Sequence, residues 1–401
     1  MAIKLTQRIT RIPASPTLAI AAKAKQLKAD GIDVLSFSAG EPDFNTPSII
    51  VEAAKQALDG GAHKYTPVPG TPKLRKEICA YVKRRHDLDY DIAEVVVSCG
   101  AKHSLYNAFQ AIIEPGDEVL VPAPAWVSYP TQIEMADGVP VIVPTEASND
   151  FIPSIEALEA AVTPRTRAFV LNSPSNPSGG VWSRDGMLAL AEWLRRHPAL
   201  IVISDSIYDE LVYDGETATE LLTLAPDLRD RYVLINGVSK SFAMTGWRIG
   251  FACAPAHVAS AMTRLQSQST SNPNAVAQAA SITAFRNSEE LVPPMRAKFQ
   301  KRRDLILAEL REIGGVDVRT PSGAFYVFPD FSAFIGKTAP DGTAISDDIA
   351  LASWLLERAR VATVPGSPFG SAGFLRFSYA TNEATIREGV RRIAEALLTL
   401  R

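Results

Sequence analysis

A lysine and an arginine lie eight residues apart in a segment of mostly small side chains. The segment reads NGVSKSFAMTGWRIG and contains Lys240 and Arg248. Lysines are usually exposed, but Lys240 follows the run YVLINGVS, whose composition is typical of a buried strand. A free amine with a pKa of about 10.4 is mostly protonated and a poor nucleophile, and an imine with an aldehyde avoids that problem. Lys240 is therefore a candidate for covalent chemistry on a carbonyl group.

Other chemically useful residues also follow apolar runs. LIVISD ends in Asp205, with Tyr208 close behind, and AFVLNSPSNPSG ends in a loop that holds Asn176. VVVSCGAK runs through Gly100 into a helical pattern, and LVPAPAW delivers Trp126. Each has an ordinary interpretation, as a helix cap, a turn, a strand–helix connection or a core aromatic residue. Because ligands bind at the carboxyl ends of parallel strands, their shared place at one sheet edge favours a binding site.

Together these residues fit a flat, anionic ring that contains nitrogen. A helix that begins at 101–102 would offer backbone N–H groups to a phosphate, and Arg248 would add a bidentate charge. Trp126 could stack on the ring, and Asp205 could keep a ring nitrogen protonated. Lys240 could form an imine with an aldehyde on the ring. Pyridoxal 5′-phosphate has all of these features.

Alternating strands and helices must position these side chains. Between about residues 95 and 255, short runs rich in β-branched residues alternate with amphipathic helical patterns. Strands that are apolar on both faces indicate a mostly parallel sheet with helices on both sides. The predicted fold class is α/β, with a mostly parallel seven-stranded sheet in a large domain and a smaller α+β domain.

The ends of the chain show a different pattern from its middle. LAIAAKAKQLKAD predicts an early helix with Thr17 as its N-cap and Gly31 just past its end. Long helical patterns and short strands such as GFLRFSYA follow the sheet region. We expect residues 1–45 to form an N-terminal arm and part of the small domain. Residues 46–290 would form the large domain, and residues 291–401 the small α+β domain.

The composition excludes several classes of protein. The 401 residues are 46% hydrophobic and 21% charged, with a net charge of −3, so no basic surface for nucleic acid is expected. No apolar run reaches the roughly 20 residues of a membrane helix, and MAIKLTQRIT lacks the apolar region of a secretory signal. Three cysteines without CxxC spacing and five scattered histidines predict a metal-free protein of the cytoplasm.

Several motifs resemble those of a known enzyme family. NSPSNPSG, SDSIYDEL, NGVSKSFAMTGWRIGFA and LRFSYA are similar to segments of the class I aminotransferases, which are pyridoxal-phosphate enzymes of fold type I. AGEPDFNTP, KYTPVPG and PSGAFYVF fit the same family. The resemblance extends from about residue 10 to residue 395 and looks closest to the bacterial and plant branch with aspartate and prephenate aminotransferases.

The resemblance implies a role for each matching residue at the cofactor. Lys240 would form the imine and, once substrate releases it, move a proton between substrate and cofactor. Asp205 would bind the pyridine nitrogen, Asn176 and Tyr208 would bind the phenolic oxygen, and Trp126 would lie over the ring. The residues expected around the phosphate are Gly100, Ala101, Lys102, Ser239 and Arg248.

The resemblance also implies substrate contacts and a partner. Arg376 would hold the substrate α-carboxylate through two parallel hydrogen bonds, with help from the backbone near Gly40. Trp126 and Asn176 would line the same space. Tyr65, in KYTP, would reach the phosphate of the other subunit, which implies a homodimer with shared active sites.

The substrate class is predicted from fewer residues. In this branch, a lysine at the start of the helix after the glycine loop holds the distal carboxylate of dicarboxylates, assisted by a Ser or Thr of a PSxT stretch. Lys102, Ser15 and Thr17 match those positions. They favour aspartate or glutamate as amino donor, with oxaloacetate or 2-oxoglutarate as acceptor. In the alternative reading, Lys102 is only a charge beside the phosphate and Thr17 only a helix cap.

Two further possibilities stay open at this level. Ala125 stands where an aromatic residue is common, and the wider pocket mouth would admit prephenate or aromatic keto acids. A carbon–sulfur β-lyase or a related lyase would share the imine lysine, the ring-binding aspartate and the carboxylate clamp. Lys102 and Thr17 favour the aminotransferase, because a β-lyase does not need an anchor for a distal carboxylate.

Overall fold

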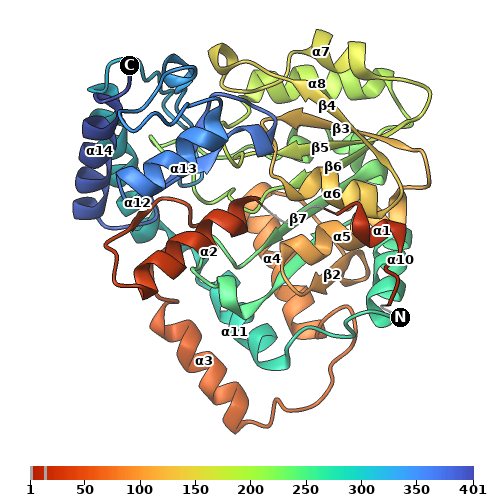
Figure 1. Ribbon diagram of the computed structural model, residues 1–401. Coiled ribbons are helices and arrows are strands. Elements are labelled where there is room, and N and C mark those ends of the chain that lie inside the picture. The colour runs from red at the N-terminus through yellow and green to blue at the C-terminus, as the bar shows by residue number, and fades with distance from the viewer. Residues whose placement is uncertain (1–2, 13–15) are drawn as a thin grey trace.

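The computed structural model describes residues 3–12 and 16–401 and is built around a seven-stranded sheet (Figure 1). The strand order is β2-β8-β7-β6-β5-β3-β4, and only β8 runs antiparallel to its neighbours. This confirms the predicted sheet. Its strands are β2 (Val95–Ser98), β3 (Glu118–Ala123), β4 (Val139–Pro144), β5 (Thr166–Asn172), β6 (Ile201–Asp205), β7 (Tyr232–Gly237) and β8 (Gly250–Cys253).

Helices cover both faces of this sheet, as its apolar strands require. In Figure 1, α7 and α8 lie above β3, β5 and β6, and α5 and α6 lie below these three strands. The edge strand β2 and the inner strands β7 and β8 are buried along their whole length, whereas β4, at the other edge, is largely exposed. The covering helices are α4 (Pro72–His86), α5 (Ala101–Ile112), α6 (Ser128–Met135), α7 (Ile155–Ala161), α8 (Arg184–Arg196), α10 (Ala256–Ser267) and α11 (Ala275–Arg286).

Local sequence signals explain where several of these helices begin. Thr71 accepts a hydrogen bond from the backbone of Leu74 at the start of α4, and Pro72 occupies the first helical position. Ser183 caps α8 and Asn274 caps α11 in the same way. These caps fix the lengths of the connections between strands and helices.

A second group of elements lies beside the sheet, coloured from teal to blue in Figure 1. β9 (Tyr326–Val327), β12 (Leu375–Ser378) and β11 (Val364–Pro365) form an antiparallel sheet. Around it lie α12 (Ser288–Arg311), α13 (Asp348–Arg358) and α14 (Glu383–Leu397). Because α12 continues across residue 290 without a break, the domain limits set from the sequence stay a prediction.

The early part of the chain packs on this second group. β1 (Leu35–Ser36) pairs in parallel with β10 (Val361–Ala362). Helix α2 (Pro16–Ala29) begins before Thr17, so the predicted N-cap is wrong and Thr17 lies in the first turn. Its end was predicted correctly. Gly31 has a φ of +81°, and the N–H groups of Gly31 and Ile32 close the helix on the carbonyls of Lys28 and Leu27.

One large apolar cluster spans the sheet and the helices of both groups. The remaining helices are α1 (Gln7–Thr10), α3 (Ser48–Asp59) and α9 (Leu221–Leu224). Among the described residues, no helix is long and apolar enough to span a membrane. Within the same part of the chain, no group of three or more His, Cys, Asp or Glu side chains could hold a metal ion.

Candidate active site

The parallel strands deliver the chemically useful side chains to one edge of the sheet. β2, β3, β5, β6 and β7 all run in one direction, because β8 reverses between β2 and β7. Their carboxyl ends therefore lie together. Asp205 is the last residue of β6. The loops that follow the other four strands carry Gly100, Trp126, Asn176 and Lys240.

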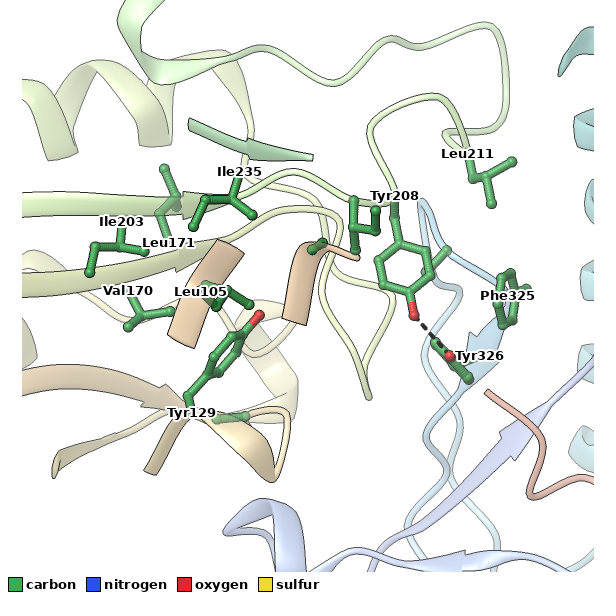
Figure 2. Packing of buried hydrophobic residues seen from close by; sticks show 14 of the residues in the cluster. Leu105, Tyr129, Val170, Leu171, Ile203, Tyr208, Leu211, Ile235, Phe325 and Tyr326 are labelled. Carbon is green, nitrogen blue, oxygen red and sulfur yellow. Dashed lines mark hydrogen bonds between the residues drawn. The ribbon is translucent and has the colours of Figure 1, made fainter. Parts of the chain in front are cut away.

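Asp205 is a buried carboxylate that one tyrosine holds in place. Its side chain is 3% exposed, and Oδ2 accepts a 2.7 Å hydrogen bond from the hydroxyl of Tyr129. The backbone N–H of Ile207 donates to Oδ1 at 3.3 Å. Burial raises the pKa of Asp205 to about 6, although both hydrogen bonds oppose that shift. In Figure 2, the Tyr129 hydroxyl points to the ends of the central strands.

Lys240 is half-buried and has an unusual amine. Its Nζ donates a 2.5 Å hydrogen bond to the carbonyl oxygen of Gly40 and lies 5.8 Å from the ring centre of Tyr208. Burial lowers the pKa of Lys240 to about 8; the charge of Glu41 opposes that shift, and the guanidinium of Arg376 adds to it. A larger share of this amine is therefore neutral near pH 8 than of a solvated lysine.

A pair of tyrosines closes the site from the side of the small sheet. The hydroxyl groups of Tyr208 and Tyr326 share a 2.9 Å hydrogen bond, shown as a dashed line in Figure 2. Tyr208 follows β6, whereas Tyr326 belongs to β9. Both rings are buried, and burial raises the pKa of each phenol. Both hydroxyl groups are therefore neutral donors at physiological pH.

Arg376 is a buried cation with no carboxylate partner among the described residues. It is 4% exposed; Nη1 donates to Oδ1 of Asn176 at 2.9 Å and Nη2 to the carbonyl oxygen of Ser38 at 3.0 Å. Its Nε has no hydrogen-bond partner within the described chain. The guanidinium lies 4.6 Å from the ring centre of Tyr326 and 5.2 Å from that of Phe369. A buried charge left in this state is suited to bind an anion.

The loop between β2 and α5 forms an anion cradle with Arg248. Gly100 has a φ of +91°, and a Cβ there would lie 2.6 Å from Nη2 of Arg248. Nη2 of Arg248 donates to the carbonyl oxygen of Cys99 at 3.2 Å. A Cβ at Gly250 would lie 2.1 Å from the backbone nitrogen of Ala101. Two glycines therefore let the exposed guanidinium and the first N–H groups of α5 face the same space.

Two serines and a lysine complete the surroundings of this cradle. Ser239 is buried, and the Oγ of buried Ser241 has no partner among the described residues. Nζ of Lys102 lies 4.6 Å from the ring centre of Trp126. Burial lowers the pKa of Lys102, and the charge of Arg248 lowers it further. Lys102 therefore has a lowered pKa and lies against the ring of Trp126.

Three predicted residues are not part of this cluster as described. Ser15 lies outside the described residues, and only the backbone of Thr17 is described. Tyr65 is 91% exposed on the connection between α3 and α4, so its own chain leaves it uncovered. Its predicted contact involves a second subunit and stays a prediction.

The sequence analysis missed several residues that shape the site. Tyr129 lies three residues after Trp126, just beyond the quoted LVPAPAW, and Tyr326 belongs to the quoted PSGAFYVF. Asn172 ends β5, donates to the carbonyl oxygen of Asp205 at 2.9 Å and accepts from the backbone of Asn176 at 3.1 Å. The available signal was their place beside residues already singled out, because buried polar groups need partners.

A cleft of about 830 Å³ opens beside the cradle. Arg248 and Cys99 line one part of it, and Phe44, Trp247 and Val276 line others. The indole N–H of Trp247 donates to Oγ1 of Thr46 at 3.0 Å, which ties the loop after β7 to the segment near Gly40. The anion cradle therefore faces an open space that the single chain does not fill.

Comparisons with known proteins agree with this arrangement. Residues 32–393 match the family described as aminotransferase class I and II. Over 389 residues the chain is 47% identical to an aspartate/prephenate aminotransferase of Cereibacter sphaeroides, which covers 97% of each protein. It is 46% identical to an aspartate aminotransferase of Geobacillus stearothermophilus, over 98% of each.

Solved structures show the same relationship. An aspartate aminotransferase of Rhizobium meliloti matches with a TM-score of 0.96 and 43% identity, over 100% of both chains. The enzyme of the same name from Thermus thermophilus, solved with maleate, matches with a TM-score of 0.92 and 41% identity, over 98% of this chain and 100% of that one. In sequence and in fold, this chain belongs to the class I and II aminotransferases.

Proposed function

We propose that this aminotransferase moves the amino group of aspartate or glutamate to a 2-oxo acid, with pyridoxal 5′-phosphate as its cofactor. The observation that carries the proposal is the grouping of Lys240, Asp205 and Arg376 at one sheet edge. The charges of a buried acid and of a buried cation without a carboxylate partner both act there on a half-buried amine with a lowered pKa. An amino acid substrate needs a clamp for its carboxylate and a base at its α-carbon.

The residues present fit pyridoxal 5′-phosphate on three sides. The cradle of Gly100, Ala101 and Arg248 offers backbone N–H groups and a guanidinium to a phosphate. Asp205, buried and held by Tyr129, offers a carboxylate to a protonated ring nitrogen. The unpartnered Oγ of Ser241 marks a buried donor without a protein acceptor.

The cofactor, when bound, supplies an aldehyde for amino exchange and a ring that withdraws electrons from the α-carbon. Lys240 would bind the aldehyde carbon and would then carry the proton that leaves the substrate Cα. Asp205 would keep the ring nitrogen protonated. Asn176 uses Oδ1 to accept from Arg376, so its Nδ2 could donate to the phenolic oxygen together with the Tyr208 hydroxyl. Trp126 would lie against the ring.

Substrate selection follows from cations at two ends of the site. Arg376 binds the α-carboxylate through two parallel hydrogen bonds. One of the donors is Nε, which has no partner within the described chain. Lys102, held over Trp126, binds the distal carboxylate, and Ser15 and Thr17 assist from the N-terminal segment. The Thermus thermophilus relative was solved with maleate, a dicarboxylate, which supports this assignment. Prephenate is a candidate acceptor, because several relatives carry it in their names.

The enzyme is proposed to act as a homodimer with shared active sites. Tyr65 is almost fully exposed, and the cleft beside Arg248 is open in the single chain. In a two-fold dimer the same surface of each copy meets its equivalent, so each Tyr65 can enter the cleft of the other copy. Its hydroxyl would add a donor to the phosphate cradle.

A half-reaction tests the proposal. The purified enzyme with bound cofactor is mixed with aspartate, glutamate, alanine, phenylalanine or cystathionine, without a keto acid. We expect absorbance to report rapid conversion to pyridoxamine phosphate with aspartate and glutamate, and slow conversion with alanine. If cystathionine yields pyruvate and no donor yields pyridoxamine phosphate, the enzyme is a β-lyase and the proposed aminotransferase activity is wrong. A rapid response to phenylalanine would extend the substrate range to aromatic amino acids.

A further inference from the structure

The connection between α3 and α4 presents an aromatic side chain to solvent while its backbone is held from below. Residues 64–71, here called the Tyr65 loop, carry Tyr65 with 91% of its surface exposed. In Figure 1 the chain leaves α3 at the bottom of the molecule and passes α11 on its way to α4. A loop without regular structure is usually mobile unless side chains or backbone partners tie it down.

Gln278, which is 0% exposed, ties this loop to α11. Its Oε1 accepts a 2.8 Å hydrogen bond from the backbone N–H of Thr71. Its Nε2 donates at 2.9 Å to Oγ1 of Thr66, the residue next to Tyr65, and at 2.9 Å to the carbonyl oxygen of Pro273. One buried amide therefore connects both ends of the loop to the segment that precedes α11.

Gln266, also 0% exposed, ties the middle of the loop to α10 and β2. Its Nε2 donates to the carbonyl oxygens of Val68 at 2.8 Å and Val97 at 2.9 Å. Its Oε1 accepts from Ser98 Oγ at 2.7 Å and from Asn107 Nδ2 at 3.1 Å. Both donors and the acceptor of this amide are in use, so it has one stable orientation.

The backbone of the loop adds further constraints. Val97 donates to the carbonyl oxygen of Pro69 at 3.0 Å. Gly70 has a φ of +98°, and a Cβ there would lie 2.7 Å from the Val97 side chain, so the loop lies directly against β2. β2 leads into Gly100, and Val276 and Ala277 of α11 line the cleft beside Arg248. The elements that carry the loop thus also form the cradle of their own chain.

We propose that Gln266 and Gln278 are positioning residues that hold the Tyr65 loop so that Tyr65 completes the phosphate cradle of a second copy of the chain. The inference rests on the proposed homodimer with shared sites, and it assigns the two glutamines an effect on the active site of the other subunit. A long, exposed tyrosine reaches a fixed point in a neighbour only if its backbone is fixed. Two buried amides that grip the loop at both ends and at its centre supply that rigidity.

The test begins with Gln278→Met, which keeps the volume and removes the hydrogen bonds. Thr66→Val is a milder second variant that removes no buried amide, and it serves if Gln278→Met folds poorly. It removes the bond from Gln278 Nε2 and the 3.3 Å bond from Thr66 Oγ1 to the carbonyl oxygen of Pro67. Gln300→Met is the matched control, because Gln300 also holds a loop through both ends of its amide. Its Nε2 donates to Oδ1 of Asp214 at 3.1 Å, and its Oε1 accepts from the backbone N–H of Asp214 at 3.2 Å. Hydrogen exchange at the Thr71 amide reports whether the loop is released.

We expect Gln278→Met to weaken cofactor binding about tenfold for pyridoxal 5′-phosphate, measured by absorbance titration of the apoenzyme. Binding of pyridoxal, which lacks the phosphate, would change less than twofold. Gln300→Met would match the wild type for both ligands. Equal losses for the two ligands would mean a general effect on folding and would overturn the proposal.

Hybrid dimers then decide which subunit feels the change. In the first hybrid, a Gln278→Met chain pairs with a Lys240→Ala chain, so the intact Lys240 site receives Tyr65 from a well-held loop. We expect wild-type affinity at that site. In the second, a wild-type chain pairs with a Gln278→Met, Lys240→Ala chain, and the intact site should show the tenfold loss. A tenfold loss in the first hybrid and wild-type affinity in the second would mean that Gln278→Met acts within its own chain, and would overturn the proposal.

Tyr65→Phe separates this inference from the function on which it rests. If Tyr65→Phe weakens phosphate-dependent binding and the hybrids behave as expected, both stand. If Tyr65→Phe weakens binding but the Gln278→Met effect stays within its own chain, the shared site stands and the role of the glutamines falls. If Tyr65→Phe has no effect, the shared site itself fails and the inference falls with it.

Discussion

The hydroxyl of Tyr129 donates a 2.7 Å hydrogen bond to Oδ2 of Asp205, at the end of the central strand β6. This bond joins helix α6 to the acid that we propose to bind the ring nitrogen. Because it stabilises the ionised carboxylate, it opposes the rise that burial produces in the pKa of Asp205. Tyr129 therefore helps to keep a buried acid in the charged form that the proposed chemistry needs.

Removal of that bond should impair catalysis without a change of fold. Tyr129→Phe leaves the Asp205 carboxylate with only the Ile207 backbone donor, and its pKa should rise above about 6. We expect kcat/KM for aspartate to fall about tenfold, the cost of one charge-assisted bond of roughly 1.5 kcal/mol. Tyr106→Phe, which alters a ring stacked near His103, is the control. Wild-type kinetics in Tyr129→Phe would contradict the assigned role.

The acid should also cost the apoenzyme stability. Its pKa is raised from 3.8 to about 6, so the folded state binds a proton more tightly than the unfolded state does. Stability is therefore lost as pH rises from about 4 to about 6 and does not return above that range. Asp205→Asn should stabilise the apoenzyme by about 2–3 kcal/mol at pH 7.5 and by little at pH 4, while it abolishes transamination. Urea unfolding at both pH values measures the difference.

The amine of Lys240 should react at a lower pH than other lysines. Burial lowers its pKa to about 8, so the neutral form dominates above that pH. We expect reductive methylation of the apoenzyme with formaldehyde, followed by mass spectrometry, to be half-maximal at Lys240 near pH 8. Arg376→Gln removes a cation that lowers this pKa and should move the midpoint upward. An unchanged midpoint in that variant would mean that the charge of Arg376 does not act on the pKa of Lys240.

Lys102 should select dicarboxylates rather than support catalysis in general. Lys102→Met keeps the alkyl contact with Trp126 and removes the charge. We expect kcat/KM for aspartate to fall about a hundredfold, which corresponds to roughly 2.7 kcal/mol, and that for alanine to change less than threefold. Lys73→Met, on the exposed side of α4, should behave like the wild type. Equal losses for both substrates would place Lys102 at the phosphate instead.

Two glycines, Gly246 before β8 and Gly250 at its first position, test the cradle geometry. A Cβ at Gly250 would lie 2.1 Å from the Ala101 nitrogen, whereas a Cβ at Gly246 would meet no atom within 4 Å. Gly250→Ala should therefore displace the start of α5, lower Tm by several degrees and weaken cofactor binding at least tenfold. Gly246→Ala should change neither quantity. Calorimetry and absorbance titration of the two variants give the comparison.

The sheet and its active edge could be predicted because they depend on local patterns. Runs such as EVVVSCG and YVLINGVS are apolar on both faces, and that pattern alone indicates parallel strands with helices between them. Once the strands are parallel, their carboxyl ends must meet, and the side chains just beyond Asp205 and Gly100 are brought together. The end of α2 at Gly31 follows from the same local physics.

The remaining features depend on contacts between distant parts of the chain. Nothing near Lys240 indicates that its amine reaches the carbonyl of Gly40, or that Tyr208 meets Tyr326. The first contact brings the segment between β1 and α3 to the loop after β7, and the second brings β9 to the segment after β6. Thr17 shows a different difficulty. Threonine is a good capping residue, but α2 begins at Pro16, so Thr17 lies inside the first turn.

β7 and β8 are antiparallel neighbours with Gly237 opposite Gly250, so the chain between them is the connection of a single β-hairpin. Lys240 and Arg248 both belong to that connection. The separation between the proposed reactive amine and the proposed phosphate-binding guanidinium is therefore set by one hairpin connection, which is anchored at both ends in inner strands of the sheet. We expect substrates of different size to be accommodated elsewhere, at Arg376 and Lys102, which come from other parts of the chain. Redesign of the substrate range should therefore change those two residues and leave the hairpin connection intact.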